Sequence, residues 1–222
     1  MKKSIFLSFI LCLCLIACIP QQVMAQKQSR MEKLLRYLND NDADKWQKNR
    51  EKLDDETKAY YAEDLSLMDV LNDLWNGQSE QAATLYFGCY EKAAQSNFPG
   101  ICEGEKIPLS QIRDKADQSI INLLEASKDK IPFSRALLDS IHATEYPVDS
   151  AMLQRLQNIR EVALLEGMLK TPTPIIYQTY VKEYPNGKFI AQVNASENVR
   201  LYQLVKTAPT PANFKAFFED PE

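Results

Sequence analysis

The chain has 222 residues, a formal net charge of −4 and an isoelectric point near 5.3. This acidic balance excludes a nucleic-acid binder of the usual basic kind, and the content of 45% hydrophobic and 25% charged residues is typical of a folded protein. A single histidine and six glycines argue against a multi-histidine metal site and a glycine-rich phosphate loop. We therefore expect a protein that is not an enzyme and that holds no cofactor and no metal ion.

Residues 1–25 have the form of a bacterial signal peptide. Lys2 and Lys3 give a positive start, an apolar run of about 15 residues follows, and Val23-Met24-Ala25 ends in a small side chain. The run is shorter than the roughly 20 residues that a membrane-spanning helix needs. We predict export to the periplasm, with cleavage after Ala25.

A second cleavage site competes with the first. Leu15-Ile16-Ala17-Cys18 matches the lipoprotein signal pattern, in which Cys18 would be acylated and would become the mature N-terminus. The alternative is that Cys18 is an ordinary apolar residue of the leader. Lipidation would associate the protein with the outer membrane, and only in that case do we expect membrane contact.

Beyond the leader, apolar residues recur at helical spacing and almost nowhere alternate as in a strand, which predicts an all-α protein. In the N-terminal region, residues 26–131, Asn76-Gly77 should end one helix and Ser79 should cap the next. Asn97-Phe98-Pro99-Gly100 is typical of a loop. We expect helices in this region over residues 28–38, 42–52, 55–75, 79–95 and 110–130.

The C-terminal region, residues 132–222, should begin with a short helix from Pro132 and a long helix over 150–170. It contains an internal repeat with a period of about 37 residues, because Thr173-Pro174 in segment 171–185 aligns with Thr210-Pro211 in segment 208–222. In both copies the threonine should cap a helix that begins with the proline. Tyr146-Pro147 precedes Tyr184-Pro185 by 38 residues and marks a weaker third copy. The expected units are about 133–170, 171–207 and 208–222, the last one partial.

Each complete unit supplies a short helix and a long one, the latter over about 190–206 in the second unit, and a unit cannot bury its apolar face without neighbours. We therefore predict antiparallel helical hairpins that stack into a short α-solenoid. The segment YQTYVKEYPNGKFIAQV resembles the degenerate tetratricopeptide-like repeats of bacterial cell-envelope proteins, over roughly residues 133–222. This resemblance implies a scaffold that binds a protein or peptide partner and carries out no catalysis.

The aromatic residues of the repeats have two interpretations. Most aromatic residues at helical spacing pack between helices, whereas some line a surface that accepts a peptide. Phe214, Phe217 and Phe218 follow the last long helix, and they either fold back on that helix or form a surface for a partner. The candidate partner-binding residues are Tyr177, Tyr180, Tyr184, Phe214, Phe217 and Phe218.

Cys89 and Cys102 are the two cysteines that remain after cleavage at Ala25. They lie 13 residues apart across the predicted loop, and an oxidising envelope favours a disulfide between them. The alternative is two separate buried thiols. The same cleavage removes two lysines and no acidic residue, which leaves 24 basic against 30 acidic residues, a charge of −6.

The segment from Asp40 to Glu51 partly resembles a calcium loop, but Lys45 stands where such a loop needs glycine. The simpler interpretation is a turn between helices, with Asp42 or Asp44 as the N-cap of the second helix. We therefore expect no metal ion there.

Two other functions remain open as alternatives. A glycan- or peptidoglycan-associated binding module would use exposed side chains such as Trp46 and Trp75. A hydrolase would need His142 paired with Glu145 and a nearby serine such as Ser134, but no third group or sequence motif supports that arrangement.

Overall fold

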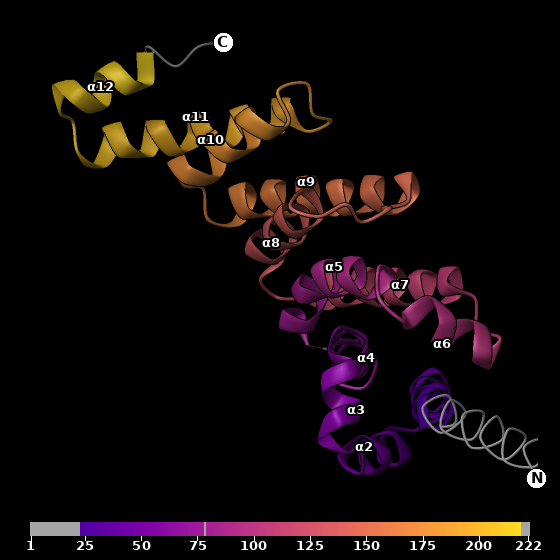
Figure 1. The fold of residues 1–222 in the computed structure, drawn as a ribbon. Coiled ribbons are helices and arrows are strands. Elements are labelled where there is room, and N and C mark those ends of the chain that lie inside the picture. The colour runs from indigo at the N-terminus through magenta and orange to yellow at the C-terminus, as the bar shows by residue number, and fades with distance from the viewer. Residues whose placement is uncertain (1–22, 78, 219–222) are drawn as a thin grey trace, which may run out of the picture. The chain divides into compact units, whose positions relative to one another are not determined.

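The structure is a computed structural model that describes residues 23–77 and 79–218. The regular elements in these ranges are α-helices, which confirms the predicted all-α class (Figure 1). Within the described ranges, no helix combines the length and the apolar character needed to cross a membrane. Residues 23–39 are helical, and Cys18 lies outside the described residues. The helices that follow are α2 (Ala43–Glu51), α3 (Asp55–Tyr60), α4 (Ala62–Trp75), α5 (Glu80–Ala94), α6 (Phe98–Glu105), α7 (Leu109–Ala126), α8 (Lys130–His142), α9 (Ser150–Lys170), α10 (Pro174–Glu183), α11 (Ile190–Thr207) and α12 (Pro211–Phe218).

Several helices begin where the sequence places a capping side chain. In each of these caps the side-chain oxygen accepts a hydrogen bond from the backbone nitrogen three residues later, at 3.1–3.3 Å. Such a bond satisfies one of the backbone donors that the first helical turn leaves unpaired. The capping residues are Asp42, Ser79, Thr173 and Thr210.

The structure corrects the predicted loop around Pro99. Residues from Phe98 onward form α6, with Asn97 as its N-cap and the proline in the first turn. Proline is tolerated there because the backbone N–H of the first turn has no partner within the helix. Phe98 and Ile101 are buried, so packing of an apolar face stabilises this helix.

The helix predicted over 55–75 is interrupted at Tyr61. This residue has φ −105° and ψ 31°, outside the helical range, and it separates α3 from α4. Its ring is buried and lies edge-on to that of Tyr60, with the centroids 4.8 Å apart. The chain is therefore divided into two helices at a buried aromatic side chain.

The chain divides into two compact units. The N-terminal unit comprises the described part of Met1–Leu123 together with Ser140–Pro147. The C-terminal unit comprises Leu124–Asp139 and the described part of Val148–Glu222. Both α7 and α8 supply residues to the two units.

In the N-terminal unit, α4 packs along α5. A group of buried rings lies within this unit, because the centroid of Tyr146 is 4.9–5.6 Å from those of Tyr86, Phe87 and Tyr90. The Tyr146 hydroxyl donates a hydrogen bond to Asp117 Oδ1 at 2.5 Å. The Ser140–Pro147 segment is therefore anchored in this unit by an aromatic side chain with a satisfied hydroxyl.

In the C-terminal unit, α10 contacts both α9 and α11, and α11 contacts α12 (Figure 1). The buried centre of this stack consists of Leu164 and Met168 from α9, Tyr180 from α10 and Val193 from α11. Tyr184 is the C-cap of α10, whereas Tyr146 lies in the other unit beyond the end of α8. Tyr146-Pro147 and Tyr184-Pro185 therefore occupy different structural positions.

Candidate protein-binding surface

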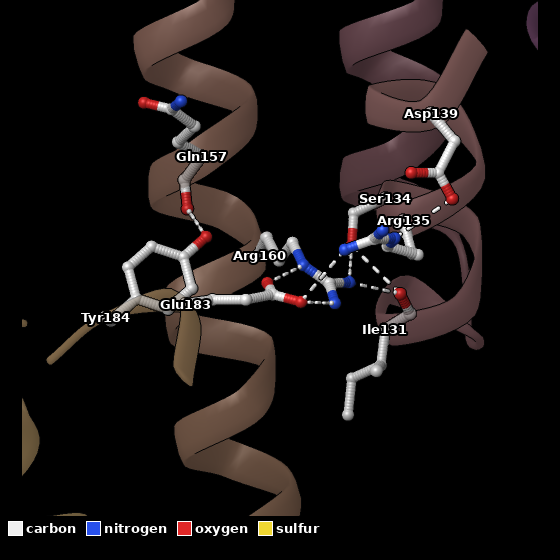
Figure 2. Close-up of polar contacts among 8 residues, drawn as sticks. All are labelled: Ile131, Ser134, Arg135, Asp139, Gln157, Arg160, Glu183 and Tyr184. Carbon is white, nitrogen blue, oxygen red and sulfur yellow. Dashed lines mark hydrogen bonds and ion pairs between the residues drawn. The ribbon is translucent and has the colours of Figure 1, made fainter. Parts of the chain in front are cut away.

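A buried arginine joins three helices of the C-terminal unit (Figure 2). Arg160 of α9 is only 2% exposed, and it donates two hydrogen bonds to Glu183 at the end of α10, from Nε to Oε2 at 2.6 Å and from Nη2 to Oε1 at 2.9 Å. Its Nη1 donates to the Ile131 carbonyl oxygen at 2.7 Å and to Ser134 Oγ at 3.1 Å, both on α8. One side chain thus fixes α8, α9 and α10 together.

Glu183 receives a second cation from α8. Arg135 Nη1 donates to Glu183 Oε1 at 3.3 Å and its Nε donates to Asp139 Oδ2 at 2.9 Å. The hydrogen bonds from Arg160 hold the pKa of Glu183 below its ordinary value, against the effect of partial burial. Glu183 is therefore ionised at neutral pH and compensates the charge of the buried guanidinium.

The residue next to Arg160 organises the turn after α10. Glu161 Oε1 accepts hydrogen bonds from the Tyr180 hydroxyl at 2.8 Å and from the backbone nitrogen of Lys188 at 2.7 Å. The Tyr180 hydroxyl in turn accepts from the backbone nitrogen of Phe189 at 3.1 Å. This network fixes the start of α11 against α9 and α10.

The aromatic residues of α10 lie within or beside the core. Tyr180, one of the candidate partner-binding residues, is completely buried and therefore offers no exposed surface in this structure. The cause is its place in the buried cluster that it forms with Met168 of α9 and Val193 of α11. Tyr177 and Tyr184 are half-buried against the same core, and the Tyr184 hydroxyl donates to a backbone carbonyl oxygen of α9 at 3.1 Å. Burial raises the pKa of both Tyr180 and Tyr184 to about 12.

The aromatic residues of α12 have a different environment. Phe214 is 42% exposed and Phe218 is 75% exposed, and their rings are stacked with centroids 6.5 Å apart. Phe217 is half-buried, and its ring centroid lies 5.3 Å from that of Phe218 and 6.4 Å from that of Tyr202 on α11. Tyr202 is 54% exposed. We call these four residues the aromatic surface.

The sequence did not identify every member of this region. Tyr202 was not among the candidate binding residues, although its three-residue offset from Val199, another exposed apolar side chain of α11, is a signal for one helix face. The Arg160–Glu183 pair had no such signal, because charged residues at helical spacing usually lie on a solvated face. The burial of the Arg160–Glu183 pair follows from the packing of α8 and α10 on α9, which the sequence does not show.

The predicted disulfide is absent, because Cys89 and Cys102 are both free thiols. Cys89 lies on α5 with its Sγ 3.5 Å from Ser66 Oγ of α4. Cys102 is buried on α6, where desolvation raises its pKa to about 12. The helix that replaces the predicted loop places the two thiols in separate environments.

The tryptophans do not form the exposed pair that a glycan-binding module would use. Trp46 is buried in the N-terminal unit, which corrects its expected exposure. Trp75 is half-buried, and the Lys115 ammonium lies 3.9 Å from the centre of its ring. A cation in this position covers the ring face on which a sugar would stack.

The other candidate sites have ordinary structural roles. Asp42 caps α2, as predicted, and also accepts from Lys45 Nζ at 2.6 Å. Ser134 is buried, donates to the Ile131 carbonyl oxygen and accepts from Arg160. His142 is an exposed residue at the end of α8.

A hollow of about 650 Å³ in the N-terminal unit is lined by residues that include Met24, Ala25, Tyr60 and Asn97. Among its described lining residues there is no carboxylate, imidazole, amine or thiol. The described ranges also contain no group of three or more His, Cys, Asp or Glu residues placed to bind a metal ion. The predicted cleavage after Ala25 would remove two residues from the wall of this hollow.

Searches against protein-family models, curated proteins and solved structures found no match.

Proposed function

We propose that this chain is an exported helical-repeat scaffold of a bacterial cell envelope, and that it binds a protein or peptide partner without catalysing a reaction. The observation that carries the proposal is the aromatic surface, in which the exposed Tyr202, Phe214 and Phe218 are joined through Phe217. Clustered exposed apolar groups mark interaction sites, and aromatic side chains often dominate the binding energy of protein interfaces.

The internal repeat supports the role of a scaffold. Thr173 and Thr210 cap α10 and α12 in the same way, and each is followed by a proline at the first helical position. We infer that the hairpins stack as in a tetratricopeptide-like α-solenoid, in which each unit covers its neighbour. Such folds generally serve as surfaces for other proteins, and this role agrees with the resemblance noted in the C-terminal region.

The leader supports the proposed location. A positive start, a short apolar run and Ala25 before the expected cleavage site direct the chain to the periplasm, and acylation of Cys18 would hold it at the outer membrane. Fractionation of cells that produce the full chain tests this part. Uncleaved protein in the cytoplasm would contradict it.

Site-specific photocrosslinking tests the binding role. The full chain is produced in a Gram-negative host with p-benzoyl-phenylalanine in place of Phe218, or in place of Tyr60 as a control that is 50% exposed in the N-terminal unit. We expect a discrete crosslinked species from position 218 that disappears when Tyr202 and Phe214 are changed to serine. The proposal is wrong if position 218 crosslinks no more than position 60.

A further inference from the structure

We propose that the partner presents an amphipathic α-helix, which packs on α12 as α11 packs on α10. This inference rests on the proposed function and specifies the class of partner. It follows from a property of the C-terminal unit: two copies of the same short helix are present, of which one is covered and the other is exposed.

The two short helices correspond residue by residue. Their caps, Thr173 and Thr210, differ by 37 positions, accept from backbone nitrogens at 3.3 and 3.2 Å and precede a proline. The same offset places Phe217 at the position of Tyr180, so the ring that is central in α10 has an aromatic counterpart in α12. The side chain next to it, Phe218, corresponds to Val181.

The long helices correspond as well. At the same offset Leu201 of α11 matches Leu164 of α9, and both are buried. Val193 matches Leu156, and both are completely buried. Thus α11 stands to α12 as α9 stands to α10, and it supplies one of the two neighbours that a short helix has in this stack.

The other neighbour of α10 is the start of α11. Val193 belongs to the buried core around Tyr180, and Phe189 and Ile190 pack against the same core. With α9 on one side and α11 on the other, Tyr180 has no exposed surface. These three apolar residues are spaced i, i+1 and i+4, which is one face of a helix.

The corresponding face of α12 has no such neighbour among the described residues. Phe217 is only half-buried, and Phe214 and Phe218 are 42% and 75% exposed. In the first copy of the repeat, the start of α11 covers this face of the short helix. We expect an element of the same kind to cover it in the second copy, namely a helix with apolar side chains at i, i+1 and i+4. We assign that helix to a partner chain, and an extended peptide would not reproduce the spacing.

A peptide with the sequence of residues 187–207 is the probe for this proposal, because it contains the segment that covers α10. A peptide of this length is largely unfolded in water, so helix formation reports its docking. Labelled peptide is titrated with the full-length protein, and binding is followed by fluorescence anisotropy and by the gain in far-ultraviolet circular dichroism. We expect saturable binding with a gain of helix.

Two control peptides and one protein variant define the result. A peptide with Phe189, Ile190 and Val193 changed to serine, and a peptide with Ala195→Pro that cannot complete the helix, should each bind at least tenfold more weakly. The protein variant with Phe214→Ser and Phe218→Ser should lose binding to the same degree. Both phenylalanines are exposed, so this variant should keep the circular dichroism spectrum of the parent.

The outcomes separate this inference from the proposed function. Equal binding of the proline peptide, or binding that survives loss of both phenylalanines, overturns the helical docking mode. Absence of peptide binding overturns it too, even when position 218 still crosslinks to a partner in cells, and in that case the proposed function stands. Absence of both peptide binding and crosslinking overturns both.

Discussion

Arg160 and Glu183 are joined by two hydrogen bonds of 2.6 and 2.9 Å, although the arginine side chain is only 2% exposed. The remaining contacts of the guanidinium are to the Ile131 carbonyl oxygen and Ser134 Oγ, so the buried cation has partners on two neighbouring helices. Two-point pairing of this kind fixes orientation as well as distance. The C-terminal unit therefore depends on a charged contact inside its core.

Removal of Arg160 should destabilise the unit strongly. In Arg160→Met, a partly buried carboxylate loses its main partner, and the free energy of unfolding should fall by about 3 kcal/mol. The control is Arg155→Met on the same helix, whose pair with Glu125 is about half exposed on both sides and should contribute less than about 1 kcal/mol. Urea denaturation followed by circular dichroism measures both. Similar losses in the two variants would show that burial of the pair is unimportant.

Acid should weaken the same contact. The pKa of Glu183 is lowered in the folded protein, first by its hydrogen bond from Arg160, so its contribution to stability is complete above the unfolded-state value of roughly 4.3 and is lost as the pH falls through the folded value. The stability of the parent should therefore fall more steeply between pH 5 and pH 3 than that of Glu183→Gln. In an Arg160→Met background, where only the longer contact from Arg135 remains, the difference in acid sensitivity between Glu183 and Gln should become smaller. A parallel fall in all the variants would exclude this carboxylate as the cause.

A methyl group at Gly187 should disturb the second network. A Cβ there would lie 2.5 Å from both Glu161 Oε1 and the Tyr180 hydroxyl, which are hydrogen-bonded to each other. We expect Gly187→Ala to lower the free energy of unfolding by about 1–3 kcal/mol. Gly88 of α5 has nothing within 4 Å of such a Cβ, so Gly88→Ala should stabilise the protein by roughly 0.5–1 kcal/mol through helix propensity. Denaturation midpoints check the two signs, and a stabilising Gly187→Ala would contradict the network.

The two thiols should differ in reactivity. Cys89 is half-buried, whereas Cys102 is buried and its pKa is raised to about 12 by desolvation, which suppresses the reactive thiolate. Iodoacetamide at pH 8 should therefore alkylate Cys89 in the native protein and Cys102 only after denaturation. Peptide mass spectrometry locates the label. Resistance of both cysteines until a reductant is added would mean that they form a disulfide in the isolated protein.

The positions of the helices were largely predictable, because apolar spacing and capping residues are local signals. The long helix from residue 150 to 170 and the caps at Ser79, Thr173 and Thr210 illustrate this. The error at Pro99 arose because the same residues suit a loop and a first helical turn, and burial of the Phe98 side chain decided between them. The types of these residues alone do not show whether the Phe98 side chain is buried, so they do not distinguish a loop from a helix.

The candidate surface was predictable in part. Tyr180 and Phe217 have the same place in the repeat pattern, yet the first is buried and the second is half-buried beside exposed rings. The difference lies in the neighbours, since Tyr180 shares a buried cluster with Val193 of the next helix. Periodicity identifies which face of a helix is apolar, and only the fold shows whether another element covers it.

The Glu161 network also has a consequence for motion. The backbone N–H groups of Lys188 and Phe189 lie in a turn, but they donate to the Glu161 carboxylate and the Tyr180 hydroxyl. Amide hydrogens in a turn usually exchange quickly with deuterium, because little has to open. Here the first amide is held by a side chain of α9 and the second by a side chain of α10, so they become accessible when the turn separates from these helices. These two amides should therefore exchange more slowly than is usual for a turn, and their exchange should report each detachment of the turn from α9 and α10.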